Sequence, residues 1–476
     1  MRLSYVGNRA SPFPPQCIEC FRDPLPRLVE HQSPKPIIRP VMTGTFRSLA
    51  GYNYRLWAGG ALVSNIGTWM QRTAQGWLVL TQLTDNNATA VGIVMALQFG
   101  PHFPLLPFTG YVADHFDRRR ILQCTQAAQG LLALGLGILT LTGAVQLWQV
   151  YVFALLLGCV SAFDAPARQT FVSELVGEAD ISNAVALNST SFNGARLIGP
   201  AVAGVLIGVI GSGWVFVINA ASYAAVLASL ACLRLNELHR APRAVRAPGS
   251  LLEGFRYVRQ RPDLRAVLLM LFLVSTFGLN FQLFIPAMAV SAFRVGAEEY
   301  GLLMSALAVG SVTGALLSAR RAGPRMGLLL AGAGSFGVGC MLAALMPNPW
   351  SFAFALVLTG IAAQTFTTTA NSTMQLATDG QMRGRVMAIY LAISLGGTPI
   401  GSPIVGWVAD TFGPRWALGV GAASGFAGLL VGLRYLVKYR GLRVHRIGGR
   451  WRVTLDGGDR ISATDAEAQA AARQPE

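Results

Sequence analysis

One carboxylate stands inside a long apolar run of this sequence, and its position makes it the first candidate for chemistry. Asp164 precedes Arg168 by four residues, the spacing at which two side chains of a helix lie side by side and form an ion pair. Burial favours a neutral carboxyl group and a nearby arginine favours the ion, so a group between these effects can take up and release a proton. The pair is therefore a candidate proton-coupling site. A structural salt bridge at a helix end is the plainer alternative.

Two arginines also lie within apolar runs. Arg72 follows Trp69 by three residues and so shares a helix face with it, whereas Arg196 lies in a later run. Charged side chains inside a membrane are costly unless they face a partner or a cavity, and Arg196 can meet either Asp164 or an anionic substrate. The amides of these runs can bridge helices by hydrogen bonds or line a cavity. The candidate substrate cavity comprises Trp69, Gln71, Arg72, Asn188, Asn193, Arg196, Asn280, Gln282 and Asn371.

Long apolar segments must position these side chains. Hydrophobic residues make up 53% of the 476 residues and charged residues only 13%, whereas a soluble domain carries about 25% charged residues. A helix needs ~20 mostly apolar residues to cross a bilayer. The predicted fold is therefore an all-α membrane protein with twelve transmembrane helices, near 56–82, 89–113, 121–143, 147–168, 184–209, 213–234, 265–292, 299–319, 326–346, 350–373, 385–409 and 414–437.

The distribution of arginines predicts the orientation. The formal net charge is +16, which could indicate nucleic acid or an anionic membrane as a partner. With both termini on one side, seventeen arginines fall in loops on that side and two, Arg294 and Arg415, in loops on the other. Loops rich in arginine remain in the cytoplasm. We therefore expect a multi-pass inner (plasma) membrane protein with both termini cytoplasmic, and no binding of nucleic acid.

A polar, basic linker separates two six-helix halves. Within it, Ser250 to Glu253 form a capping box that predicts a short amphipathic helix on the inner membrane surface, with a solvated linker as the alternative. The two halves are related by a repeat at a fixed offset, in which Trp214 corresponds to Trp416. The predicted domains are a largely disordered extension at 1–54 (Met42 being a possible true start), a six-helix half at 55–234, the linker at 235–264, a second half at 265–437 and a cytoplasmic tail at 438–476.

Several motifs resemble the major facilitator superfamily over about residues 43–437. Gly110 to Arg120, GYVADHFDRRR, is similar to the superfamily's signature loop, while the corresponding loop of the second half carries Ser318 in place of the acid. An acid near a helix N-terminus is favoured by the helix dipole, and Arg118 can pair with it. The resemblance implies a latch between conformations, formed by Gly110, Asp114, Arg118 and Arg119.

Four further motifs narrow the resemblance to the branch that contains the enterobactin exporter and macrolide-efflux proteins. They begin at Asn65, Phe163, Ala195 and Glu253. A glycine-proline stretch resembles the signature of proton-antiporting members, although its spacing differs. It implies a hinge in the fifth helix, formed by Gly194, Gly199, Pro200 and Gly204.

The predicted function is secondary transport by alternating access, in which two halves rock around a site near the bilayer midplane. We expect a monomer in the lipid bilayer that exports a lipophilic drug-like or siderophore-type small molecule, driven by protons and without a cofactor. Uptake of a small metabolite is the alternative. A membrane sensor or enzyme is disfavoured because no hydrolase, metalloprotease or phosphate-loop motif occurs. Cys17 and Cys20 form a lone CxxC, so no metal site is expected.

Overall fold

The computed structural model describes residues 46–239, 251–321, 323–439, 443–447 and 450–454. The chain divides into residues 1–43 and a compact unit from Gly44 to Glu476, and all the described helices and strands belong to the second unit. Most of the predicted extension at 1–54, with Met42, Cys17 and Cys20, lies outside the described residues.

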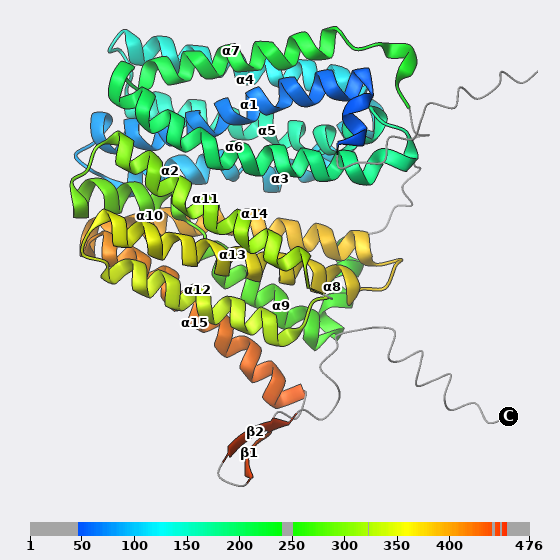
Figure 1. Ribbon diagram of the computed structural model, residues 1–476, viewed down its shortest axis with the longest axis vertical. Coiled ribbons are helices and arrows are strands. Elements are labelled where there is room, and N and C mark those ends of the chain that lie inside the picture. The colour runs from blue at the N-terminus through cyan, green and yellow to red at the C-terminus, as the bar shows by residue number, and fades with distance from the viewer. Residues whose placement is uncertain (1–45, 240–250, 322, 440–442, 448–449, 455–476) are drawn as a thin grey trace, which may run out of the picture. The chain divides into compact units, whose positions relative to one another are not determined.

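The first half consists of long helices after a short 3₁₀ turn (Arg47–Ala50). Figure 1 shows these helices running alongside one another. They are α1 (Tyr52–Leu78) with a π-helical end (Val79–Leu83), α2 (Ala88–Phe99), α3 (His102–His115), α4 (Arg118–Leu141), α5 (Leu147–Glu174), α6 (Ile181–Ile210) and α7 (Ser212–Ala231).

The second half repeats this plan. Its helices are α9 (Pro262–Leu273) with the π-helical turn Val274–Gly278, α10 (Phe281–Ala287) with the π-helical end Met288–Phe293, α11 (Ala297–Ala319), α12 (Met326–Leu345), α13 (Pro349–Leu376), α14 (Arg383–Phe412) and α15 (Pro414–Tyr439).

Two of the twelve predicted runs are interrupted in the structure. The second run breaks at Gly100 and Pro101 into α2 and α3; proline cannot donate the backbone hydrogen bond that would continue the helix. The seventh run breaks at Leu279 and Asn280, between a π-helical turn and α10. Hydropathy measures only apolar length, so it predicted each run as one uninterrupted helix.

The membrane character of the fold is clear from helix length and composition. Among the described residues, eleven helical segments are long and apolar enough to span a membrane. A twelfth, α1, has 27 residues but a mixed composition that includes Arg55 and Arg72. The predicted all-α fold of two six-helix halves is confirmed.

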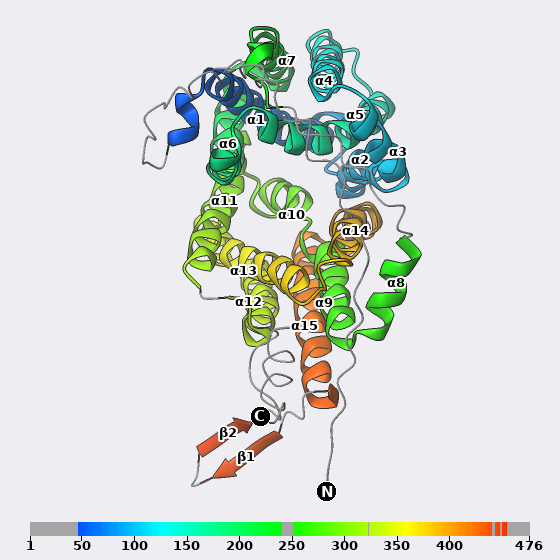
Figure 2. The ribbon, with the colours of Figure 1, turned by 90° about the vertical axis from the view of Figure 1, so that its right-hand side faces the viewer.

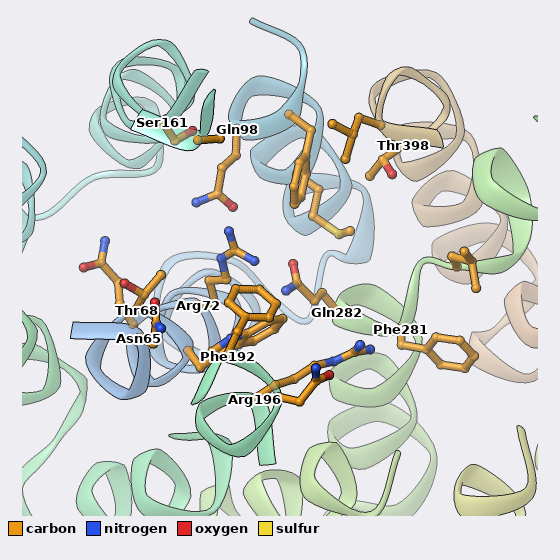
Figure 3. A pocket seen from close by; sticks show the side chains of 18 of the residues that line it. Asn65, Thr68, Arg72, Gln98, Ser161, Phe192, Arg196, Phe281, Gln282 and Thr398 are labelled. Atoms are coloured by element: carbon orange, nitrogen blue, oxygen red, sulfur yellow. The ribbon is translucent and has the colours of Figure 1, made fainter. Parts of the chain in front are cut away.

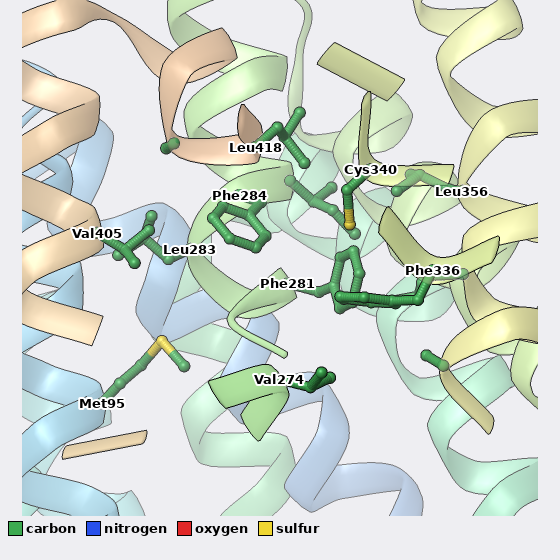
Figure 4. Close-up of a cluster of buried hydrophobic side chains, with 14 of the residues drawn as sticks. Met95, Val274, Phe281, Leu283, Phe284, Phe336, Cys340, Leu356, Val405 and Leu418 are labelled. Carbon is green, nitrogen blue, oxygen red and sulfur yellow. The ribbon is translucent and has the colours of Figure 1, made fainter. Parts of the chain in front are cut away.

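Aromatic and aliphatic side chains fill the interior of the second half. Figure 4 shows Phe281, Phe284, Phe336, Cys340 and Leu418 gathered in one buried cluster. The ring centroids of Phe281 and Phe284 lie 5.7 Å apart, edge to face, the arrangement that the ring quadrupoles favour. Phe281 and Phe284 belong to α10, so this cluster fixes the position of α10, which also contacts α1 and α2 of the first half.

The two halves meet through two helix pairs, α2 with α14 and α6 with α11, and Figure 2 shows both pairs with α10 between them. Glycines permit the close approach. A Cβ atom on Gly204 of α6 would lie 3.0 Å from the Cα of Gly301 on α11, and one on Gly406 of α14 would lie 2.7 Å from the Cα of Thr89 on α2. Gly204 and Gly406 correspond in the sequence repeat, so matched positions of the two halves contact the opposite half.

The linker contains the short helix α8 (Leu251–Gln260), in the position where the sequence predicts one. Glu253 forms an ion pair with Arg385 of α14 at 2.6 Å, and the hydroxyl of Tyr257 donates to a carboxylate oxygen of Asp379 at 3.0 Å. Partial burial raises the pKa of Tyr257. Phe255 remains exposed, whereas Val258 is buried in the hydrophobic core, so both polar and apolar side chains fasten α8 to the second half.

The tail contains an antiparallel hairpin of β1 (Arg443–Ile447) and β2 (Arg450–Thr454), in which Val444 is paired with Val453. The sequence suggests a hairpin from Trp451 to Ile461 with a turn at 456–458. Trp451 lies in β2, whereas that turn and Ile461 lie outside the described residues.

Candidate functional site

A cavity of about 760 Å³ lies between the two halves. The first half contributes side chains from all seven of its helices, and the contribution of the second includes Gln282, Met304, Gln364 and Thr398. Figure 3 shows the polar side chains that point into it, among them Gln98 and Gln282. This volume is in the range that holds a drug-sized molecule, ~300–1,000 Å³.

Most of the predicted cavity residues line this space. Trp69, Gln71, Arg72, Asn188, Asn193, Arg196 and Gln282 do so, from α1, α6 and the start of α10. Their role in binding substrate remains a prediction.

Asn280 and Asn371 are not part of the wall. Asn280 is fully buried and donates its side-chain amide to the carbonyl of Thr276 at 2.7 Å, so it caps the broken helix before α10. Asn371 accepts a hydrogen bond from Gln375 one turn later on α13, at 2.5 Å. Both amides bond within their own segment, so in the structure they neither line this cavity nor bridge two helices by these bonds, which were the two possibilities that the sequence left open.

An aromatic and cationic group occupies part of the first-half wall. The guanidinium carbon of Arg72 lies 4.9 Å from the centroid of the Trp69 ring, and that of Arg196 lies 5.6 Å from the same ring. Phe192 packs edge-on against Trp69 at 5.8 Å. Arg72 also lies 5.7 Å from the ring of Phe99. Cation–π contacts of this kind stabilise arginine away from water.

Asp164 of α5 is surrounded by donors. Its carboxylate accepts hydrogen bonds from Thr125 and Gln126 of α4, each at 2.7 Å, and pairs with Arg168 at 3.0 Å. The residue is 6% exposed and lines the cavity with Arg168. The i,i+4 pair forms as the spacing indicates. Arg196, the other suggested partner of Asp164, instead lies against Trp69.

The cavity also contains an ionisable residue that the sequence reasoning missed. His102 begins α3 directly after the Gly100-Pro101 break, and its Nε2 lies 3.4 Å from the hydroxyl of Ser161. Its Nδ1 is buried and has no hydrogen-bond partner in the described part of the chain. The sequence does show a histidine inside an apolar run. It was missed because only aspartate, glutamate, lysine and arginine were counted as charged residues within these runs.

The predicted latch is partly described. The surroundings of Gly110 and the side chain of Asp114 are not among the described parts of the structure, so the expected contact of Asp114 with Arg118 stays a prediction. Arg118 forms an ion pair with Glu174 at the end of α5, and Arg119 donates to the carbonyl oxygen of Leu230 at 2.8 Å. These two arginines therefore connect the start of α4 to the ends of α5 and α7.

The four predicted hinge residues lie on α6, which is helical throughout despite Pro200. A Cβ atom on Gly199 would lie 2.7 Å from the Cβ of Trp69, and one on Gly204 would lie 2.6 Å from the carbonyl oxygen of Ala297. A Cβ atom on Gly194 would contact nothing within 4 Å. Gly199 and Gly204 thus permit close packing. Bending at these positions stays a prediction.

Hydrogen bonds join the two halves along α2 and α14. The carboxylate of Asp410 at the end of α14 accepts from the backbone amides of Ala88 and Thr89 at 2.6 and 2.8 Å. These amides open α2, where a negative charge is favoured by the helix dipole. Farther along the same pair of helices, Ser402 donates to the carbonyl oxygen of Gly92 at 2.9 Å.

Comparison with known families decides what kind of molecule this is. The sequence profile of the transmembrane secretion effector family matches residues 42–442. The chain belongs to this family. Transmembrane secretion effectors of this type are major facilitator transporters, so the chain is a multi-pass secondary transporter and not an enzyme.

Two curated relatives of this secretion effector are a staphyloferrin A transporter and an enterobactin exporter. The staphyloferrin A transporter of Staphylococcus aureus is 26% identical over 73% of this chain and 87% of its own length. The enterobactin exporter EntS of Shigella flexneri is 27% identical over 77% of this chain and 87% of its own length. The resemblance to the enterobactin-exporter branch, first noted from short motifs, is confirmed.

Solved structures share the fold of this secretion effector. A bacterial homologue of the iron transporter ferroportin, in an inward-facing state, aligns with a TM-score of 0.62 and 14% identity over 80% of this chain and 98% of its own. The nucleoside transporter NupG aligns with a TM-score of 0.64 and 13% identity over 80% and 99%. At these identities the likeness establishes the fold alone.

Proposed function

We propose that this transmembrane secretion effector exports a siderophore-type small molecule by proton antiport. The observation that carries the proposal is the cavity that both halves line with polar and apolar side chains, in a chain whose curated relatives include a staphyloferrin A transporter and an enterobactin exporter. In transporters of this architecture, substrate binds between the halves and the halves rock around it. No cofactor is needed, and the protein works as a monomer in the inner membrane.

The arginine count supports an orientation for this cycle. It assigns both termini and Arg118 to the cytoplasm, so the contact between Asp410 and Ala88 lies on the outer side. In the proposed cycle, the state in which the cavity opens to the cytoplasm is the one that loads an exported molecule. Arg118, Arg119 and Asp114 act as the cytoplasmic latch when the halves rock.

Asp164 is the proposed proton-coupling residue. It is the single carboxylate among the described residues that line the cavity, and its hydrogen bonds come from Thr125, Gln126 and Arg168. Rocking of the halves changes the access of water to the cavity, and with it the balance that determines whether the carboxyl group is charged. Proton uptake on one side and release on the other would drive export.

Transport in everted membrane vesicles tests this proposal. Everted vesicles that contain the protein should accumulate enterobactin or staphyloferrin A when the membrane is energised, and a protonophore should abolish the accumulation. Vesicles without the protein are the control. Accumulation only in right-side-out vesicles would reverse the direction to uptake, and accumulation of lipophilic drugs alone would replace the substrate class. No transport of either kind in either orientation would contradict the proposal.

A further inference from the structure

Two partly buried arginines of the cavity have no acidic partner among the residues that the structure describes. Within the described part of the chain, the ion pairs formed by arginine involve Arg47, Arg118, Arg168, Arg234, Arg261 and Arg385, and neither Arg72 nor Arg196 is among them. The Nε of Arg72 is buried and has no hydrogen-bond partner there. Unpaired charges and unsatisfied donors are costly away from water, so these groups indicate a missing anion.

The cavity's own carboxylate cannot supply that anion. Asp164 already accepts hydrogen bonds from Thr125 and Gln126 and pairs with Arg168. Of the charged side chains in the described wall, three are arginines and one is an aspartate, leaving a net charge of +2 from these four groups. The excess positive charge belongs to Arg72 and Arg196.

The surroundings of the two arginines define the shape of the missing group. Both guanidinium groups lie against Trp69, at 4.9 and 5.6 Å from its ring centroid, and Phe192 packs edge-on against the same ring. Figure 3 shows Arg72, Phe192, Arg196 and Gln282 gathered in one part of the cavity. A guanidinium group presents a planar fork of donors that matches a carboxylate, and the aromatic rings offer flat surfaces beside it.

We infer that Arg72 and Arg196, held against Trp69, bind a carboxylate group of the transported molecule. This inference rests on the proposed function and deepens it by naming the chemical group that the cavity recognises. Gln282 faces the same region from the second half, so a bound anion contacts both halves at once.

Binding of a matched pair of probes tests the inference. Salicylate and salicylamide have the same ring and hydroxyl group but differ in charge, and their affinities for the full-length protein in lipid nanodiscs can be measured by equilibrium dialysis. The protein should bind salicylate more tightly than salicylamide. Arg72→Gln and Arg196→Gln should each weaken salicylate binding by about tenfold to a hundredfold, as expected for loss of a charge-assisted hydrogen bond, and leave salicylamide binding within about twofold.

Arg55→Gln is the matched control, because Arg55 is an exposed arginine of the same helix α1; it should change neither affinity. Equal wild-type affinities for the two probes, no saturable binding of salicylate, or equal losses for both probes in the arginine variants would overturn the inference. The transport assay separates this failure from that of the proposed function. Siderophore export at wild-type rates by both arginine variants would refute the anion site alone, whereas charge-selective binding without export would refute the exporter alone.

Discussion

Asp164→Asn should abolish accumulation of substrate against its gradient while leaving downhill exchange measurable. The asparagine keeps the shape of the side chain and can still accept from Thr125 and Gln126, which bond to Asp164 at 2.7 Å. It cannot take up or release a proton. The ratio of substrate concentrations across an energised vesicle should therefore fall to about one, because an uncoupled carrier only equilibrates its substrate.

Asp180→Asn is the control for this experiment. Asp180 is a partly exposed carboxylate outside the cavity wall that pairs with Arg47 at 2.9 Å, before the start of α6, so its loss should leave accumulation unchanged. If Asp164→Asn still concentrates substrate when a proton gradient is the only energy source, the Asp164–Arg168 pair is a structural salt bridge. His102, with its unpartnered Nδ1, would then be the next candidate.

Gly204→Leu should reduce transport by at least about tenfold, while Gly194→Leu should change it less than about twofold. A Cβ atom at Gly204 would lie 2.6 Å from the carbonyl oxygen of Ala297, whereas at Gly194 there is nothing within 4 Å. Overpacking costs ~1–3 kcal/mol, which shifts a two-state equilibrium by about one to two orders of magnitude. The leucine should therefore disfavour the state in which α6 and α11 are in contact.

Initial transport rates, corrected for the amount of protein in the membrane, measure this effect. Gel filtration of both variants shows whether each protein is folded. Gly194→Leu is the matched control, because both glycines lie on the same helix and receive the same substitution. Equal transport by the two variants would show that the contact between α6 and α11 does not limit the cycle.

The membrane fold could be predicted because the length of the apolar segments decides it. A helix must be about twenty apolar residues long to cross a bilayer, and runs such as that of α12 (Met326–Leu345) show this directly in the sequence. The breaks within two runs were missed because apolar length does not register them. Pro101 was visible in the sequence, but the break at Asn280 depends on packing around α10.

The cavity was partly predictable for a similar reason. Charged and amide side chains in apolar runs must face a partner or a cavity, and Arg72 and Arg196 obey that rule. The rule does not say whether a given amide turns toward a cavity or toward a nearby partner. Asn280 and Asn371 were therefore predicted to line the cavity, although they do not. The pairing of Arg118 with Glu174 joins residues 56 positions apart, a contact that only the packing of α4 against α5 creates.

Access to the cavity from each side of the membrane tests the central claim most directly. Gln282→Cys, in a variant without the six native cysteines, places a thiol in the cavity wall between the halves. A membrane-impermeant maleimide should label it from the cytoplasmic side in the resting protein, and from the outer side when a substrate gradient and a proton gradient drive the cycle. Labelling from one side under every condition, or from both sides at once, would contradict alternating access through this cavity.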